Sequence, residues 1–185
     1  MARPGSKAIV LDRDGVINSD SADYIKHPSE WHALAGSLEA IAMLAQAGYR
    51  TFVVTNQSGI GRGLFTLETL AAIHAKMLAA VAAAGGEIEG IYFCPHAPAD
   101  GCDCRKPHAG LLRRIEAEHG LSLAGAPMIG DKWSDLVAAQ RVGARGILVL
   151  TGVGRQTLAA HRGEIEECYE DLAAAAARVL CEASG

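Results

Sequence analysis

The sequence predicts an α/β fold in which helices cover both faces of a mainly parallel β-sheet. Short β-branched runs alternate with longer helical patterns, and the apolar runs are continuous rather than interrupted by polar residues. Half of the 185 residues are hydrophobic, which is enough for a sizeable core. Continuous apolar strands are typical of parallel sheets that are buried on both faces. We therefore expect three layers formed by a single domain over residues 1–185.

The predicted elements follow one another along the chain. Strands are expected at 8–11, 51–54, 88–93, 127–129 and 146–150. Helices are expected at 37–46, 67–84, 109–119 and 135–142, and helical residues dominate 164–180. Thr66 provides a cap for the second helix, and Gly48 and the Gly85-Gly86 pair end the first two helices.

Composition excludes several classes of protein. The net charge of −4 gives no reason to expect a nucleic-acid partner. Residues 1–6 lack the apolar run of a secretory signal, and no apolar run is long enough to span a membrane. Five cysteines, an odd number, argue against a disulfide framework. We expect a cytoplasmic protein without a membrane partner, in which Cys168 and Cys181 are ordinary buried or half-buried thiols.

Residues that can carry chemistry follow four of the predicted strands. Asp12 follows the first strand, Thr55 the second, Cys94 the third and Asp131 the fourth. In parallel α/β sheets, ligands bind beyond the carboxyl ends of the strands. The sequence therefore predicts a binding site at that edge of the sheet.

Asp12 and Asp14 place two carboxylates directly after a buried strand. The simpler interpretation is a helix cap and a turn, since Asp favours such positions and Gly15 permits an unusual backbone. The polar residues at the other strand ends favour a catalytic site instead. Magnesium binds oxygen, usually from one or two carboxylates together with substrate phosphate and water, and Asp12 and Asp131 fit that description.

Over residues 7–150, the order of Asp12-x-Asp14, Thr55, Lys106 and Asp131 resembles the four motifs of the haloacid dehalogenase superfamily of phosphatases. The resemblance implies that Asp12 is the nucleophile, which becomes an aspartyl phosphate, and that Asp14 is the general acid and base. It implies that Mg²⁺ is held by Asp12, Asp131 and the backbone carbonyl of Asp14. Thr55 and Lys106 would stabilise the transferring phosphoryl group.

The segments between these motifs are short. One helix fits between Asp14 and Thr55, and a helix, a strand and a loop fit between Thr55 and Lys106. Neither segment can also hold a cap domain of ordinary size. We therefore expect a Rossmann-like three-layer fold without a large cap, with an open site, and a monomer.

Asp135, one turn after Asp131, is expected to support the metal or its waters.

The loop after the third strand has the composition of a zinc site. Its pattern is C-x-H…C-x-C, formed by Cys94, His96, Cys102 and Cys104. Three thiolates and one imidazole complete a tetrahedral Zn²⁺ set and leave no position for a reacting water, so this zinc would be structural. The alternative is a redox loop or a chance cluster. Because Cys104 directly precedes Arg105 and Lys106, the zinc would direct these two cations toward the phosphate site.

The local sequences resemble one family of the superfamily closely. DRDGVIN at 12–18, VVTNQSGIGRG at 53–63, YFCPH at 92–96, CDCRKP at 102–107 and GDK at 130–132 are similar to motifs of the D-glycero-D-manno-heptose 1,7-bisphosphate 7-phosphatase family. The resemblance implies a sugar bisphosphate substrate, on the route to nucleotide-activated heptose for bacterial lipopolysaccharide core or surface glycans. The implied substrate contacts are Asp20, Asp23, Tyr24, Thr55, Asn56, Gln57, Ser58, Arg105, Lys106 and Lys132. Arg105 would recognise the retained phosphate through its guanidinium fork.

Three alternatives differ in identifiable features. Histidinol-phosphate phosphatase shares the aspartates and the zinc loop, but its second motif usually reads T-N-Q-D-G-L-G, where this chain has TNQSGIG. A signalling receiver domain takes its acidic metal residues and its phosphoacceptor from different strands. A nicotinamide site would need G-x-G-x-x-G after the first strand. The sequence leaves open the preferred anomer, the choice of nucleotide and the role of Arg62.

Overall fold

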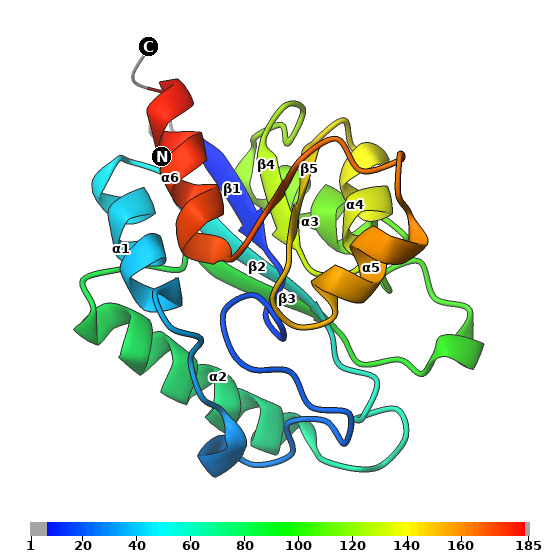
Figure 1. Cartoon of the computed structure of the whole chain (residues 1–185). Coiled ribbons are helices and arrows are strands. Elements are labelled where there is room, and N and C mark those ends of the chain that lie inside the picture. Colours follow the sequence, from blue (N-terminus) through cyan, green and yellow to red (C-terminus); the bar gives the residue numbers. More distant parts are fainter. Residues whose placement is uncertain (1–6, 184–185) are drawn as a thin grey trace.

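The computed structural model describes residues 7–183 and contains a six-stranded sheet (Figure 1). The spatial order of the strands is β3-β2-β1-β4-β5-β6. They comprise β1 (Ala8–Leu11), β2 (Arg50–Asn56), β3 (Gly90–Cys94), β4 (Pro127–Gly130), β5 (Arg145–Val149) and β6 (Cys168–Tyr169). All five neighbouring pairs are parallel, which confirms the predicted sheet.

The strand β1 lies inside the sheet, where the direction of chain progression reverses. Leu11 pairs with Val53 of β2 on one side and with Ile129 of β4 on the other. The chain moves outward from β1 to β3 and then crosses back to β4. The crevice at such a switch point, beyond the carboxyl ends of the strands, is where α/β sheets bind ligands. Asp12 is the first residue after β1 and therefore begins at this crevice.

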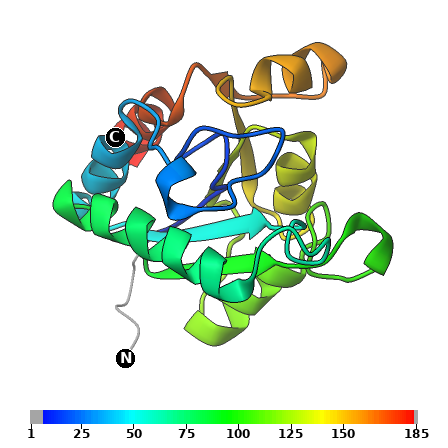
Figure 2. The ribbon, with the colours of Figure 1, turned by 90° about the horizontal axis from the view of Figure 1, so that it is seen from below.

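Helices cover the sheet on both sides. They are α1 (Ser37–Gln46), α2 (Leu67–Ala83), α3 (Gly110–His119), α4 (Trp133–Gln140), α5 (Gly154–Ala160) and α6 (Leu172–Ala183), with short 3₁₀ helices η1 (Pro28–Glu30) and η2 (Pro98–Asp100). Figure 1 shows α1 and α6 on one side of the strands and α3 and α4 on the other. Figure 2 shows α5 projecting at the periphery. Thr66 caps α2 as expected, since its side chain accepts a hydrogen bond from the Thr69 N–H at 3.2 Å.

Two apolar cores result from the alternation of side chains along each strand. Ile9 and Leu11 belong to the core shared with α1, α2 and α6. Ala8 and Val10 belong to the core shared with α3 and α4. Burial on both faces explains why the strands read as continuous apolar runs in the sequence. Packing in these two cores holds the sheet in place, and the sheet in turn sets the positions of the residues at the carboxyl ends of its strands.

The connections between the first three strands are short, as predicted. Only η1 and α1 lie between β1 and β2, and only α2 lies between β2 and β3. Within residues 7–183, the chain has no large cap domain over the sheet. The same part of the chain also contains no helix that is long and apolar enough to cross a membrane.

The last part of the chain departs from the prediction. The segment 164–180 was expected to be helical, but it contains β6, and α6 begins only at Leu172. The helix α5 was not predicted, and α4 begins at Trp133 rather than at residue 135. A two-residue edge strand has no periodicity to recognise, so tertiary pairing with β5 decides it. Cys168 and Cys181 are exposed, which corrects the expectation of buried thiols.

Candidate active site

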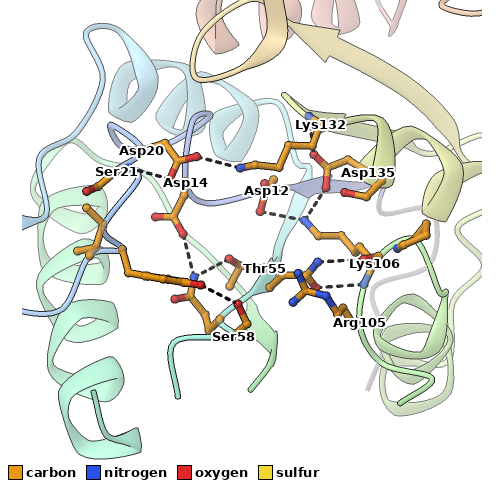
Figure 3. Close-up of a pocket in the computed structure, with 16 residues that line it drawn as sticks. Asp12, Asp14, Asp20, Ser21, Thr55, Ser58, Arg105, Lys106, Lys132 and Asp135 are labelled. Atoms are coloured by element: carbon orange, nitrogen blue, oxygen red, sulfur yellow. Dashed lines mark hydrogen bonds and ion pairs between the residues drawn. The ribbon is translucent and has the colours of Figure 1, made fainter. Parts of the chain in front are cut away.

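A cavity of about 470 Å³ opens at the carboxyl edge of the sheet (Figure 3). Eleven predicted site residues line it: Asp12, Asp14, Asp20, Tyr24, Thr55, Asn56, Gln57, Ser58, Arg105, Lys106 and Lys132. Ser21, Ser134 and Asp135 line it as well and were not predicted as substrate contacts. Asp23 is exposed and is not among the described lining residues, so its contact with substrate stays a prediction.

Lys106 is the central cation of the cavity. Its Nζ lies 2.9 Å from Asp12 Oδ1 and 2.7 Å from Asp135 Oδ1, and it donates to the Val54 carbonyl at 2.7 Å. Burial lowers the pKa of Lys106, but the charges of Asp12 and Asp135 outweigh that effect and raise it. Figure 3 shows the side chain lying between the two carboxylates. The fully charged ammonium therefore sits beside the residue expected to receive the phosphoryl group.

Three buried carboxylates form a cluster below the cavity. One oxygen each of Asp12, Asp131 and Asp135 lies within 4.8 Å of the others. Burial, and then the charge of Asp12, raises the pKa of Asp131 to about 7. Among the described residues, Asp131 Oδ1 has no hydrogen-bond partner, although the Lys132 ammonium lies 3.3 Å away. A buried carboxylate oxygen that accepts no hydrogen bond, beside two further carboxylates, fits a hard divalent cation such as Mg²⁺.

Asp135 has more contacts than the sequence indicated. Its Oδ2 accepts a hydrogen bond from the Lys132 backbone N–H at 3.0 Å, at the start of α4. Its other oxygen pairs with Lys106, as described above. Asp135 therefore joins the fourth motif to Lys106, and its expected support of the metal stays a prediction.

Asp14 is held by a set of donors that sequence reasoning missed. Arg13 donates to both carboxylate oxygens at 2.8 Å, and Asn18 and Gln57 donate at 2.9 and 2.8 Å. Burial raises the pKa of Asp14, but the charge of Arg13 and these hydrogen bonds outweigh it and lower the pKa. The Arg13 side chain is fully buried, and its Nη1 also lies 3.2 Å from His74 Nε2. The contacts in this conformation favour the ionised form of the Asp14 carboxylate.

Two side chains of the second motif hold other site residues in place as well as lining the cavity. Gln57 donates to Thr55 Oγ1 at 2.8 Å as well as to Asp14, and so links the two. The Asn56 amide makes two 3.0 Å hydrogen bonds with the backbone of Lys106, one as donor and one as acceptor. Asn56 therefore holds Lys106 in place across 50 residues of sequence.

The mouth of the cavity carries two further cations. Lys132 Nζ lies 3.0 Å from Asp20 Oδ2, which connects the loop after the first motif to the fourth motif (Figure 3). Burial lowers the pKa of Lys132, but the nearby carboxylates, Asp12 first, raise it overall. Arg105 Nη1 is buried and has no hydrogen-bond partner within residues 7–183. Both cations are placed to meet an anionic substrate.

The predicted zinc ligands come together beside the cavity. Cys94, His96, Cys102 and Cys104 all offer ligand atoms within 4.8 Å of one another. The His96 Nδ1–Cys104 Sγ distance is 3.2 Å, and the Cys94–Cys104 and Cys94–Cys102 Sγ–Sγ distances are 3.3 and 3.5 Å. Ligands about 2.1–2.3 Å from a tetrahedral zinc lie roughly 3.4–3.8 Å apart. The three distances of 3.2, 3.3 and 3.5 Å lie at or just below this range, so the four ligand atoms are close enough together to bind one zinc ion.

Comparison with known proteins supports the expected family. A family model described as haloacid dehalogenase-like hydrolase matches residues 103–175. The D-glycero-β-D-manno-heptose 1,7-bisphosphate 7-phosphatase of Bordetella bronchiseptica is 51% identical over 180 residues, which cover 96% of this chain and 99% of that protein. The enzyme of the same name from Pseudomonas aeruginosa is 49% identical and covers 93% and 97%.

Solved structures agree with this relationship. The crystal structure of the B. bronchiseptica phosphatase complexed with magnesium and phosphate superposes with a TM-score of 0.92 and covers 95% of this chain and 99% of that chain. The Burkholderia thailandensis D,D-heptose 1,7-bisphosphate phosphatase has a TM-score of 0.73 at 45% identity and covers 94% and 98%. These relatives disfavour histidinol-phosphate phosphatase as the alternative. The chain belongs to the D-glycero-D-manno-heptose 1,7-bisphosphate 7-phosphatase family of haloacid dehalogenase-like phosphatases.

Proposed function

We propose that this protein hydrolyses the 7-phosphate of D-glycero-β-D-manno-heptose 1,7-bisphosphate and releases inorganic phosphate. The observation that carries the proposal is the pairing of Asp12 with Lys106 at the floor of a polar cavity, in a chain about 50% identical to phosphatases with that name. The names of these relatives specify the β anomer, which the sequence motifs alone left open.

In the first step, an oxygen of Asp12 attacks phosphorus while the bond from phosphorus to the sugar oxygen breaks. Lys106 and Thr55 bind the phosphoryl oxygens, on which negative charge is concentrated in the transition state. Asp12, Asp131 and the Asp14 carbonyl would hold Mg²⁺, which neutralises the charge that otherwise keeps a carboxylate and a phosphate dianion apart. The product of this step is an aspartyl phosphate and the free sugar hydroxyl, once a proton has reached the leaving oxygen.

Asp14 supplies that proton and then takes one from the water that hydrolyses the aspartyl phosphate. The ionised state favoured by Arg13 suits the second role, in which a base is needed. For the first role Asp14 must gain a proton, and an arriving phosphate dianion near its carboxylate favours protonation. Arg13 and Gln57 keep the side chain at the cavity wall between the two steps.

The remaining cavity residues select the sugar. Arg105, with its unpaired Nη1, would bind the retained phosphate through charge-assisted hydrogen bonds, and Lys132 and Asp20 would contact the sugar end. The loop 20–24 and residues 56–58 complete the wall. A Zn²⁺ bound by the cysteine and histidine cluster would fix Cys104 and hence the two cations that follow it. The proposal includes a monomeric, single-domain, cytoplasmic enzyme in which loops take the place of a cap.

The test is phosphate release from a panel of sugar phosphates by the Mg²⁺-loaded protein. We expect the highest kcat/KM on heptose 1,7-bisphosphate, with the β anomer preferred over the α anomer and histidinol phosphate well below both. Equal or higher kcat/KM on histidinol phosphate would refute the substrate assignment and leave the phosphatase chemistry standing. Absence of phosphate release from every ester, with metal bound, would refute the chemistry itself.

A further inference from the structure

The segment 151–157 comprises the end of the loop after β5 and the first four residues of α5, and it contacts the carboxylate of Asp131. None of the four motifs includes this segment. The Val153 backbone N–H donates to Asp131 Oδ2 at 2.9 Å, whereas Asp131 Oδ1 accepts no hydrogen bond from the described residues. The two oxygens of this side chain are therefore unequal. The backbone holds Oδ2, whereas Oδ1 has no hydrogen bond from residues 7–183 and only faces the Lys132 ammonium at 3.3 Å, so a divalent cation can bind it.

Two glycines from separate parts of the chain enclose the held oxygen. A Cβ on Gly152 would lie 2.2 Å from Asp131 Oδ2, and a Cβ on Gly15 would lie 2.3 Å from the same atom. Both glycines have positive φ, +57° and +85°, and a Cβ on Gly152 would also lie 2.7 Å from the Gly15 Cα. Any side chain at either position would displace the carboxylate or the loop.

Two threonine hydroxyls tie the same parts together. Thr151 Oγ1 donates to the Gly15 carbonyl at 2.6 Å. Thr157 Oγ1, from α5, donates to the Asp131 carbonyl at 2.8 Å. Segment 151–157 is thus hydrogen-bonded to the loop that follows β1 and to the end of β4, which carry Asp12 and Asp131 respectively.

We propose that segment 151–157 is a positioning element of the active site, which holds Asp131 with Oδ2 buried against the backbone and Oδ1 presented to the divalent cation. Gly152 provides the space, the Val153 N–H and the Thr157 hydroxyl fix Asp131, and Thr151 holds the first-motif loop at the matching position. The inference rests on the metal site of the proposed function and not on the identity of the substrate. Groups that orient metal ligands in this way typically change metal affinity by about 10–100-fold when they are removed.

A purely structural role for this segment would affect stability without affecting the metal, so metal affinity is the deciding quantity. Mn²⁺ binding to the intact protein, measured by electron paramagnetic resonance of the free ion, needs neither substrate nor turnover. We expect Gly152→Ala to lower Mn²⁺ affinity by about 10–100-fold. Gly120→Ala is the matched control, because Gly120 has nearly the same φ of +59° and no described atom lies within 4 Å of its Cβ position.

A second pair of variants avoids backbone strain. Thr151→Val removes the hydroxyl donor at nearly constant volume, and Thr151→Ser retains it. We expect weaker Mn²⁺ binding for Thr151→Val and recovery of affinity for Thr151→Ser. Wild-type affinity in both Gly152→Ala and Thr151→Val would overturn the proposal, even if both variants were less stable. Failure of the wild-type protein to bind Mn²⁺ would overturn it together with the proposed metal site, whereas a different sugar specificity would leave it intact.

Discussion

Within residues 7–183, two clusters of side chains can hold a metal, and they are built in opposite ways. The zinc ligands all lie within eleven consecutive residues, from Cys94 to Cys104. The carboxylates of the other cluster come from the ends of β1 and β4 and from α4, so that Asp12 and Asp135 are separated by more than a hundred residues. One cluster is a local loop, and the other exists only when the sheet is assembled.

The clusters also differ in what they leave open. Four protein ligands satisfy zinc completely, and His96 lies exposed at the surface. The carboxylate cluster is fully buried and leaves an oxygen of Asp131 without a hydrogen bond from the described residues, next to a cavity. A closed set suits a structural metal, whereas an incomplete set suits one that shares its coordination with substrate. Cys104 and Lys106, two residues apart, connect the two clusters.

Of the variants that distinguish the two clusters, Asp12→Asn is expected to have the largest effect. The amide cannot act as the nucleophile, so kcat should fall by at least about 10⁴-fold, roughly 5.5 kcal/mol in activation free energy. The fold should persist, because Asp135 still pairs with Lys106. Phosphate release and zinc content would be measured together. Wild-type turnover, or a label from a labelled ester that never attaches at position 12 of the wild-type protein, would contradict the nucleophile assignment.

Cys102→Ser should disturb the zinc cluster and, through it, the catalytic one. We expect loss of zinc and a reduction in kcat of about 10–100-fold, because Arg105 and Lys106 follow the released ligands directly. Cys181→Ser is the matched control, since Cys181 is exposed and outside the cluster. Zinc content by elemental analysis and activity should fall together. Full activity in a zinc-free variant would show that the two clusters are independent.

A smaller effect is expected for Arg105→Lys at the cavity mouth. Lysine keeps the charge but loses the planar fork, so KM should rise by about 10-fold, or about 1.4 kcal/mol, with little change in kcat. Arg62→Lys is the control, because Arg62 is exposed and does not line the cavity. Steady-state kinetics on the bisphosphate would measure both. An unchanged KM for Arg105→Lys would remove Arg105 from substrate recognition.

The smallest predicted effect concerns His74, which contacts Arg13, and its contribution to the stability of the fold at acidic pH. Burial, and then the charge of Arg13, lowers the pKa of His74 from 6.5 to about 4. Protonation therefore favours the unfolded chain, and this part of the stability is complete above pH 6.5 and is lost as the pH falls toward 4. His74→Gln keeps a polar partner for Arg13 and cannot titrate.

Urea unfolding of the zinc-loaded wild type and of His74→Gln from pH 7.5 to 5.5 would measure this contribution. We expect the wild type to lose about 1 kcal/mol more than the variant by pH 5.5, after allowance for partial exposure. Because both proteins carry the same zinc loop, its own acid sensitivity cancels in the difference. Parallel pH profiles for the two proteins would mean that His74 does not contribute.

Much of the architecture could be predicted because its signals are local. Continuous apolar runs predicted the strands β1 to β5, and Thr66 and Gly48 marked helix ends correctly. The zinc ligands were identifiable because C-x-H…C-x-C places four donors in one loop. The residues after the strands could be assigned to one site because parallel strands point their carboxyl ends in the same direction.

The sequence by itself determined which residue types stand at the ends of which strands, and therefore which chemistry the chain can carry. Only the tertiary structure decided how these residues are held: Arg13 on Asp14, Asn56 on the backbone of Lys106, and segment 151–157 around Asp131. The strand β6 and the helix α5 were likewise decided by packing. The physical reason is that a strand or a chelating loop is specified by neighbouring residues, whereas the partner of a buried side chain depends on the relative placement of segments far apart in the chain.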